Sequence, residues 1–302
     1  TRQMGCWRLL QTFYGRRTAG GNFRDFFEKT VREVKNTDFD RCPEEPCLYR
    51  CKLTNVALLH HVDDEKTHGP DEIHDGVLDE IEKQLLTKRG ERMISGSKDQ
   101  YLGRTKYRFT TKDSDEILTM AHSKHVRKIV SVLGLESAKS FAVPGCKTDT
   151  KFTGSEDLLD EAQATLYRSC VGSAIFLADD RNEIKFVAKK LSQKMAKPTK
   201  GAWARLKRLG RFLKGRPNLA RRVQLLDKNP KFLDCHCDTD WAGEEDDEDE
   251  MRKSTDGGQI SVGGAVVHAW SSTQPGLPSL SSAEAELRGM VRCAKEALYV
   301  QK

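Results

Sequence analysis

Three groups of carboxylates have the residue types and surroundings that bind divalent metal ions. Asp63 and Asp64 come shortly after Val56–Leu59, an apolar run typical of a buried strand. Asp238 lies on the polar face of an alternating strand, and Glu286 lies one turn into a predicted helix. Hard cations such as Mg²⁺ take oxygen ligands, and a strand aspartate facing a helix glutamate begins the ligand set of two-metal nucleases. These four acids are therefore candidate metal ligands.

Each of these acids also has a simpler interpretation. Adjacent aspartates are common in polar surface turns, and the helix dipole favours an acid in the first turn of any helix. The residue types alone leave both interpretations open.

Cysteine and histidine form two further clusters that could bind metal, namely Cys42, Cys47 and Cys51 with His60 and His61, and the run Cys235, His236 and Cys237. Neither cluster has the paired CxxC spacing of a structural zinc site. In the second, strand alternation points the histidine away from both cysteines. A zinc-binding module is therefore the less favoured interpretation. The odd number of cysteines, without a secretory signal, predicts a reduced, intracellular protein.

Positive charge is concentrated in one part of the chain. Lys and Arg number 51 against 45 Asp and Glu, and residues 185–222 hold 14 basic residues and no acidic one. Such a block is typical of proteins that bind a polyanion such as nucleic acid, although a solvated helix face has the same composition. The candidate phosphate-binding residues are Lys200, Arg205, Lys207, Arg208, Arg211 and Lys214. The acidic run EEDDEDE at 244–250 predicts a loop.

The hydrophobic pattern predicts a mixture of helices and strands. No apolar run approaches the ~18 residues of a transmembrane helix, which excludes a membrane-spanning protein of that type. Helices are expected at 22–34, 71–90 and 116–134 and throughout 155–222, and strands at 47–49, 55–62 and 101–109. Towards the C-terminus we expect a strand at 231–241, a hairpin turning at Gly263-Gly264, and a helix opened by a capping box from Ser281 to Glu284. The apolar residues expected to bury this last helix are Ala283, Leu287, Met290, Ala294 and Leu298.

Taken together, these segments resemble the polyprotein of copia-type long-terminal-repeat retrotransposons over nearly the whole chain. CDTDWAG, RKSTDGG and SVGGAVVHAWSSTQPGLPSLSSAEAEL are similar to the SDADWAG strand, RKSTSG segment, WxSKKQ turn and SSTEAE helix of the family's ribonuclease H. Nearer the N-terminus, FYGRRTAGGNFRDFF resembles the LYGLKQAP region of its reverse transcriptase, HVDD the YVDD hairpin, and YLG a later palm motif. The resemblance implies an α+β fold in three parts: a partial reverse-transcriptase palm and fingers at 1–150, a helical thumb or connection at 151–228, and a truncated ribonuclease H-like βββα unit at 229–302.

The resemblance also implies roles for individual residues. Asp63 and Asp64 match the polymerase carboxylates, and Asp238 and Glu286 match the first two ribonuclease H metal ligands, with Mg²⁺ as the cofactor at both sites. An RNA–DNA hybrid or another nucleic acid is the implied partner, held by the basic block.

The sequence departs from the family in its acids. The family's further palm aspartate would precede Thr1, and its third ribonuclease H aspartate would follow Lys302. The strand after HVDD is normally apolar but here is Glu65–His68. We therefore expect a polyprotein fragment that is inactive by itself. The alternative is a catalytically dead, nucleic-acid-binding relic that uses residues 185–222.

Overall fold

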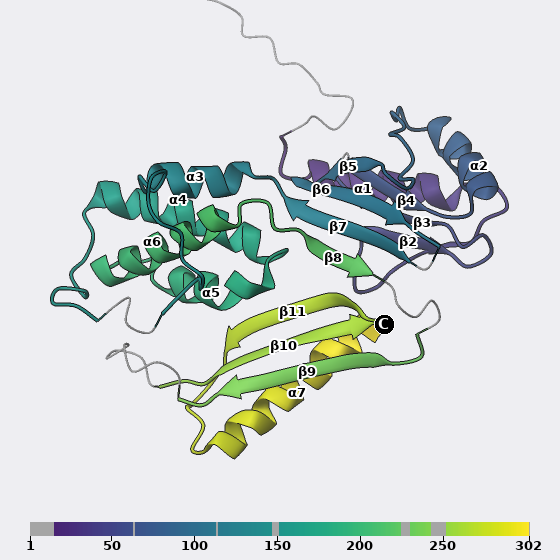
Figure 1. Ribbon diagram of the computed structural model, residues 1–302. Helices are drawn as coiled ribbons and strands as arrows, with labels where there is room; N and C mark the ends of the chain where they lie inside the picture. Colours follow the sequence, from purple (N-terminus) through teal and green to yellow (C-terminus); the bar gives the residue numbers. More distant parts are fainter. Residues whose placement is uncertain are drawn as a thin grey trace, which may run out of the picture. The chain divides into compact units, whose positions relative to one another are not determined.

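The computed structural model describes residues 15–62, 64–112, 114–146, 151–224, 230–242 and 252–301. Contacts divide the chain into two compact units, Thr1–Glu91 and Arg92–Lys302. The described residues form an α+β fold with three antiparallel sheets and seven α-helices (Figure 1), which confirms the predicted fold class at that level. None of the helices in these ranges has the length and apolarity needed to cross a membrane.

The first unit is a four-stranded antiparallel sheet, in the order β1-β2-β3-β4, with two helices. Its strands are β1 (Phe39–Arg41), β2 (Leu48–Cys51), β3 (Ala57–His61) and β4 (Asp64–His68). Helices α1 (Ala19–Arg32) and α2 (Asp71–Glu82) share one apolar core with the sheet, which includes Phe27, Tyr49, Leu58 and Ile81. The predicted helix at 22–34 and the predicted strands are confirmed, and the helix predicted at 71–90 ends earlier, at Glu82.

The second unit begins with another four-stranded antiparallel sheet, in the order β5-β6-β7-β8. Its strands are β5 (Lys98–Tyr101), β6 (Arg104–Thr110), β7 (Asp115–Ala121) and β8 (Arg221–Gln224). Leu102 and Gly103 connect β5 to β6 with φ angles of 48° and 73°, and positive φ at both positions is the mark of a two-residue type I′ hairpin. The YLG motif is therefore a hairpin turn.

A helical bundle lies between β7 and β8 along the chain. It contains α3 (Lys124–Val132), α4 (Glu161–Ala178), the 3₁₀ turn η2 (Asn182–Ile184), α5 (Lys185–Gln193) and α6 (Lys200–Gly215). The side chains of Asp160 and Thr199 accept hydrogen bonds from the backbone amides of Gln163 and Ala202, in the first turns of α4 and α6, which stabilises both helix starts. The bundle core includes Tyr167, Leu177, Ile184, Leu191, Leu206 and Leu213.

Two stretches predicted as helix contain strands. The stretch 116–134 includes most of β7 before α3 begins, and 155–222 ends in β8. Residues Glu116–Thr119 of β7 pair with Arg221–Gln224 of β8, and the Arg222 guanidinium binds both oxygens of Glu116 at 2.6 and 2.8 Å. A partner about a hundred residues away decides the conformation here, and no local pattern reveals it.

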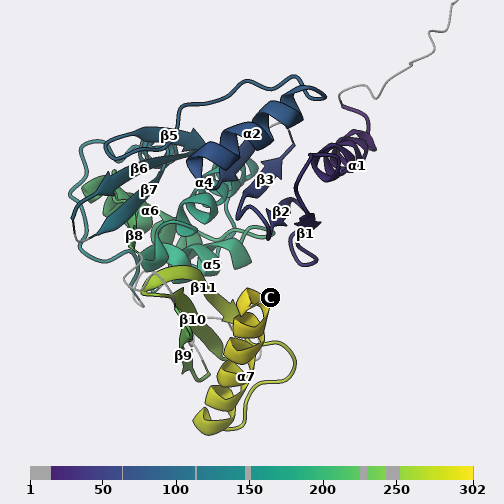
Figure 2. The same cartoon turned by 90° about the vertical axis from the view of Figure 1, so that its right-hand side faces the viewer.

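The C-terminal part of the second unit is a three-stranded antiparallel sheet with one helix on its face (Figures 1 and 2). The strands β9 (Leu233–Asp240), β10 (Thr255–Val262) and β11 (Ala265–Thr273) lie in the order β11-β10-β9, and α7 spans Ser282–Gln301. Gly263 and Gly264 turn the hairpin with φ of 55° and 86°. The Ser281 hydroxyl accepts a hydrogen bond from the Glu284 amide at 3.2 Å. Both sequence signals are thus confirmed.

The buried face of α7 differs from the predicted apolar stripe. Ala285, Gly289 and Cys293 are buried, whereas Leu287, Met290 and Leu298 are about 60% exposed. A Cβ at Gly289 would overlap the Thr239 hydroxyl of β9. The helix therefore lies so close to the sheet that small side chains, rather than large ones, fit between them.

A second close approach makes Gly258 of β10 sensitive to substitution. A Cβ there would overlap the Trp270 ring and come within 2.7 Å of the His236 carbonyl oxygen, whereas at Gly257 the nearest atom is 3.7 Å away. We expect Gly258→Ala to lower the free energy of unfolding by about 1–3 kcal/mol through overpacking. Gly257→Ala, the matched control, should cost much less. Urea unfolding followed by tryptophan fluorescence measures both, and equal losses would contradict the packing described for Trp270.

Candidate carboxylate site and nucleic-acid interface

The β3–β4 hairpin carries the first candidate acids. Leu58 is buried in β3, and the last residue of that strand, His61, pairs with Asp64, the first residue of β4. Asp64 is exposed, and Asp63 lies outside the described residues. Val62 has a φ of 57°, a left-handed conformation that is strained for a β-branched side chain. The hairpin therefore presents the Asp64 carboxylate to solvent, two residues after the strained Val62.

His60, in β3 of this hairpin, packs in the apolar core of the first unit and is not placed as a metal ligand. The side chain is 3% exposed, its ring lies 4.7 Å from Phe27 and 5.9 Å from Tyr49, and neither ring nitrogen has a hydrogen-bond partner. Burial, followed by the charge of Arg24, lowers the pKa of His60, so the ring stays neutral. Its cross-strand partner Glu65 has a pKa raised by burial.

The cysteine clusters do not form a metal site in the part of the chain that the structure describes. The Cys51 thiol donates a hydrogen bond to the Asp38 carboxylate at 2.9 Å, so it serves the fold of the first unit. Among the described residues, no group of three or more His, Cys, Asp and Glu side chains is arranged to hold a metal ion.

The strand register separates Asp238 from Glu286. Helix α7 packs on the β9 face that carries Thr239, and its Arg292 lies 3.4 Å from the carboxylate of Asp256, the residue paired with Thr239. Because successive side chains of a strand point to opposite faces, Asp238 faces away from α7, the helix that carries Glu286. The expected arrangement, with these two acids facing each other and sharing a cation, does not follow from this register.

One acid missed by the sequence reasoning lies on the α7 face. Asp256 is 2% exposed, and its Oδ1 atom has no hydrogen-bond partner, as is also true of the Thr239 hydroxyl nearby. The residue belongs to the RKSTDGG segment, and an acid inside a strand was the signal available. Sequence alone could not show which face of the sheet it occupies.

The basic residues of α6 are partly used to hold the segment 138–142. The Arg208 and Arg211 guanidinium groups lie 4.3 and 3.8 Å from the centre of the Phe141 ring. Arg211 also donates to the Lys139 carbonyl and Lys214 to the Ala138 carbonyl, both at 2.6 Å. Carbonyl oxygens and an aromatic ring carry no net charge, so these contacts fix the cations in place without neutralising them.

The other predicted phosphate-binding residues lie along the same helix. Lys207 is exposed and its ammonium lies 5.9 Å from the Trp203 ring centre. Lys200 pairs with Asp157 at 2.9 Å, and Arg205 is half-buried. Lys200 and Lys207 are both exposed, but Lys200 already has an acid beside it.

Comparison with known proteins shows that the chain is similar to polyproteins of plant transposons. Over 248 residues, 81% of the chain, it is 27% identical to the retrovirus-related Pol polyprotein from transposon RE2 of Arabidopsis thaliana. Over 207 residues, 64% of the chain, it is 28% identical to the corresponding protein from transposon RE1 of the same plant. The chain is homologous to transposon Pol polyproteins. This confirms the resemblance to retrotransposon polyproteins.

The chain is much shorter than these Pol polyproteins, since the matched region spans 16% and 14% of their lengths. It is also 27% identical over 183 residues to an uncharacterized mitochondrial protein of Arabidopsis thaliana, which covers 60% of the chain and 72% of that protein. No model of a known protein family matches the chain, and no solved structure does.

The buried His60 should make the stability of the first unit depend on pH. An exposed histidine in the unfolded chain titrates near pH ~6.5, whereas the folded ring resists protonation. Stability should therefore fall as the pH drops through about 6.5, and level off below the lowered folded pKa, with a slope of at most ~1.4 kcal/mol per pH unit. In the intact chain, His60→Phe should remove this contribution and His61→Phe, at the exposed neighbour, should not. Urea unfolding by circular dichroism at pH 7.5 and 5.5 tests this, and identical slopes in both variants would refute it.

Proposed function

We propose that this chain is the reverse transcriptase–ribonuclease H portion of a retrotransposon Pol polyprotein, and that it binds nucleic acid through α6. The observation that carries the proposal is the acid-free basic segment 185–222, whose central helix holds several cations in fixed positions against 138–142. The homology to transposon Pol polyproteins supports the same conclusion.

Binding through α6 would be electrostatic and independent of sequence. Arginine and lysine side chains that neutralise backbone phosphates release condensed counterions, which drives association at low salt. The stacking of Arg208 and Arg211 on Phe141 restricts both side chains before binding, so less conformational entropy is lost when a phosphate is contacted. The resemblance to retrotransposon polyproteins makes an RNA–DNA hybrid the proposed partner, and we propose that binding takes place inside the cell.

The parts of the fold suit the proposed assignment. The β3–β4 hairpin with its acids would belong to a reverse-transcriptase palm, α4 to α6 to a thumb or connection, and β9 to α7 to a ribonuclease H-like βββα unit. The proposed boundaries at residues 150 and 228 remain predictions.

Magnesium enters the proposal only through the residues that would hold it. The exposed Asp64 carboxylate has the oxygen ligands that Mg²⁺ prefers, and Asp63 would be the second ligand. An ion held by these two residues would stabilise negative charge at a phosphodiester. Asp238 and Glu286 do not fit a shared ion, because Asp238 faces away from α7. We therefore assign no cleavage step to that pair. A catalytically dead, nucleic-acid-binding relic is the second candidate function, and the separation of these two acids favours it.

Binding to a labelled RNA–DNA hybrid should weaken steeply with salt. About five phosphate contacts on a duplex give a log–log slope near −4 to −5. Lys207→Glu should weaken binding to hybrid and DNA duplexes alike and make the slope shallower by about 1. Lys88→Glu makes the same charge change at an exposed position in the first unit and is the matched control. Fluorescence anisotropy over a salt series measures the slope, and an affinity that does not change with salt would sink the proposal.

Hydrolysis of the same hybrid should stay at background in Mg²⁺. The physical reason is the strand register, which keeps Asp238 and Glu286 from forming one metal site. A gel assay with end-labelled RNA should show no cleavage by the purified chain, whether or not Asp238→Asn is present. Cleavage that Asp238→Asn and Glu286→Gln both abolish would show that this pair does catalyse the reaction.

A further inference from the structure

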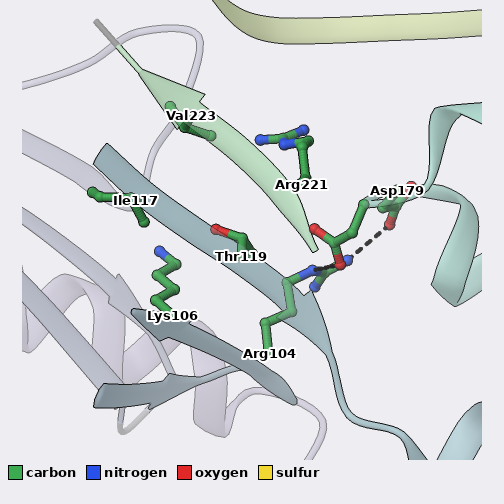
Figure 3. Close-up of a pocket in the computed structure, with 8 residues that line it drawn as sticks. Arg104, Lys106, Ile117, Thr119, Asp179, Arg221 and Val223 are labelled. Carbon is green, nitrogen blue, oxygen red and sulfur yellow. Dashed lines mark hydrogen bonds and ion pairs between the residues drawn. The ribbon is translucent and has the colours of Figure 1, made fainter. Parts of the chain in front are cut away.

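A polar pocket of about 390 Å³ lies on the β6–β7–β8 sheet of the second unit (Figure 3). Its volume falls in the range of small-molecule sites in proteins, which begins near 300 Å³. The charged and polar residues that line it are Arg104, Lys106, Thr119, Asp179, Asp180 and Arg221. Arg221 lies at the end of the basic segment 185–222, but none of these residues belongs to α6 or to the candidate carboxylates.

Three of these residues form one row across the sheet. Lys106 of β6 pairs directly with Thr119 of β7, and Thr119 pairs directly with Arg221 of β8. Directly paired residues of antiparallel strands point to the same face, with strands about 4.8 Å apart. Figure 3 shows the three side chains on the same side of the sheet. A hydroxyl group is therefore placed between two cationic side chains.

The two acids of the pocket are both bound to its third cation. Arg104 donates to the Asp180 carboxylate at 2.7 Å and to the Asp179 carboxylate at 3.1 Å. A metal ion would have to displace this arginine, so the acids do not favour a cation. With three cations and two acids in its lining, the pocket has a net positive charge, concentrated on the Lys106–Thr119–Arg221 row.

Arg221 has an unused donor in this row. Its Nε atom is buried and has no hydrogen-bond partner, a condition that costs free energy unless an acceptor is supplied. Positive charge is dense around it. Burial lowers the pKa of Lys185, and the charge of Arg221 lowers it further, against the opposing effect of Asp179 and Asp180. An anionic ligand would relieve both conditions.

We propose that this pocket binds the phosphate group of a nucleotide, with Lys106, Thr119 and Arg221 contacting its oxygens. An ammonium, a hydroxyl and a guanidinium together supply the several donors that a phosphate with three acceptor oxygens requires. Ile117 and Val223, paired in the next row of the sheet, complete the lining with an apolar wall, against which a sugar or base packs. The site does not depend on the proposed binding through α6.

Isothermal titration calorimetry on the full chain tests the site with adenosine 5′-monophosphate, inorganic phosphate and adenosine. We expect the monophosphate to bind, inorganic phosphate to bind more weakly, and adenosine not to bind. Arg221→Gln and Thr119→Val should each weaken the monophosphate by about tenfold or more, because each removes a donor to a charged group. Thr119→Ser, which keeps the hydroxyl, should bind within about threefold of the unaltered chain.

Arg222→Gln is the matched control, because Arg222 is the next residue of the same strand, points to the other face and pairs with Glu116. It should leave the affinity unchanged, as should Lys207→Glu on α6, so a failure of the α6 proposal is distinguishable from a failure of this one. Thermal melting checks that each variant folds. No binding of the monophosphate, equal binding of adenosine, or unchanged affinity in a folded Arg221→Gln would each overturn the proposal.

A short oligonucleotide distinguishes the two sources of the phosphate. If the trinucleotide of deoxyadenosine binds more tightly than the monophosphate and loses affinity in Arg221→Gln, the site holds a phosphate within a strand. If the monophosphate binds more tightly, the site holds a free nucleotide. In both cases the proposed contacts are those of the Lys106–Thr119–Arg221 row. An oligonucleotide affinity that neither Arg221→Gln nor Thr119→Val changes would contradict these contacts.

Discussion

The pairing of β8 with β7 is the interaction on which the second unit depends. The Glu116–Arg222 ion pair joins residues 106 positions apart in the chain. Because β7 and β8 are neighbours in one sheet, the segment that contains α3 to α6 leaves this sheet after β7 and returns to it at β8. The entropic cost of closing such a long loop grows only slowly with its length. The bundle core offsets this cost by burying side chains such as Tyr167 and Leu206 completely. The same pairing brings Arg221 to Thr119 and so builds the phosphate row.

Several cationic side chains in this unit contact other parts of the same unit. Arg208, Arg211 and Lys214 tie the segment 138–142 to α6, and Arg104 binds the two acids at the end of α4. Surface ion pairs contribute little to stability, but hydrogen bonds to carbonyl oxygens keep the cation charged and limit its motion. The cations of such a surface are already ordered before an anion binds, although some of their N–H groups already donate hydrogen bonds to carbonyl oxygens.

Local signals predicted local structure well. The Gly263-Gly264 turn and the Ser281 cap each depend on residues within one hairpin or one helical turn, and the structure has both where the sequence predicted them. The features that were missed depend on contacts with distant residues. Helix α3 lies within 116–134 as predicted, but the strand β7 before it was not predicted, because its partner β8 is far along the chain. The buried stripe of α7 was predicted from large side chains, whereas Gly289 sets the contact with the sheet. The face occupied by Asp238 follows from the strand alternation, but which face α7 covers does not. Asp256 and the pocket were missed because both depend on register across strands.

The position of β9 at the end of the β11-β10-β9 sheet has a consequence for the colloidal behaviour of the protein. In the described part of the chain, one side of this strand has no strand partner, and its backbone groups form a template on which another copy can add. Asp234, Asp238 and Asp240 stand at alternate positions along it and share one face with His236. Antiparallel addition of a second β9 brings these aspartates near one another, and the repulsion opposes the association. Asp238, which suggested metal binding from the sequence, would therefore also oppose self-assembly at the edge of this sheet.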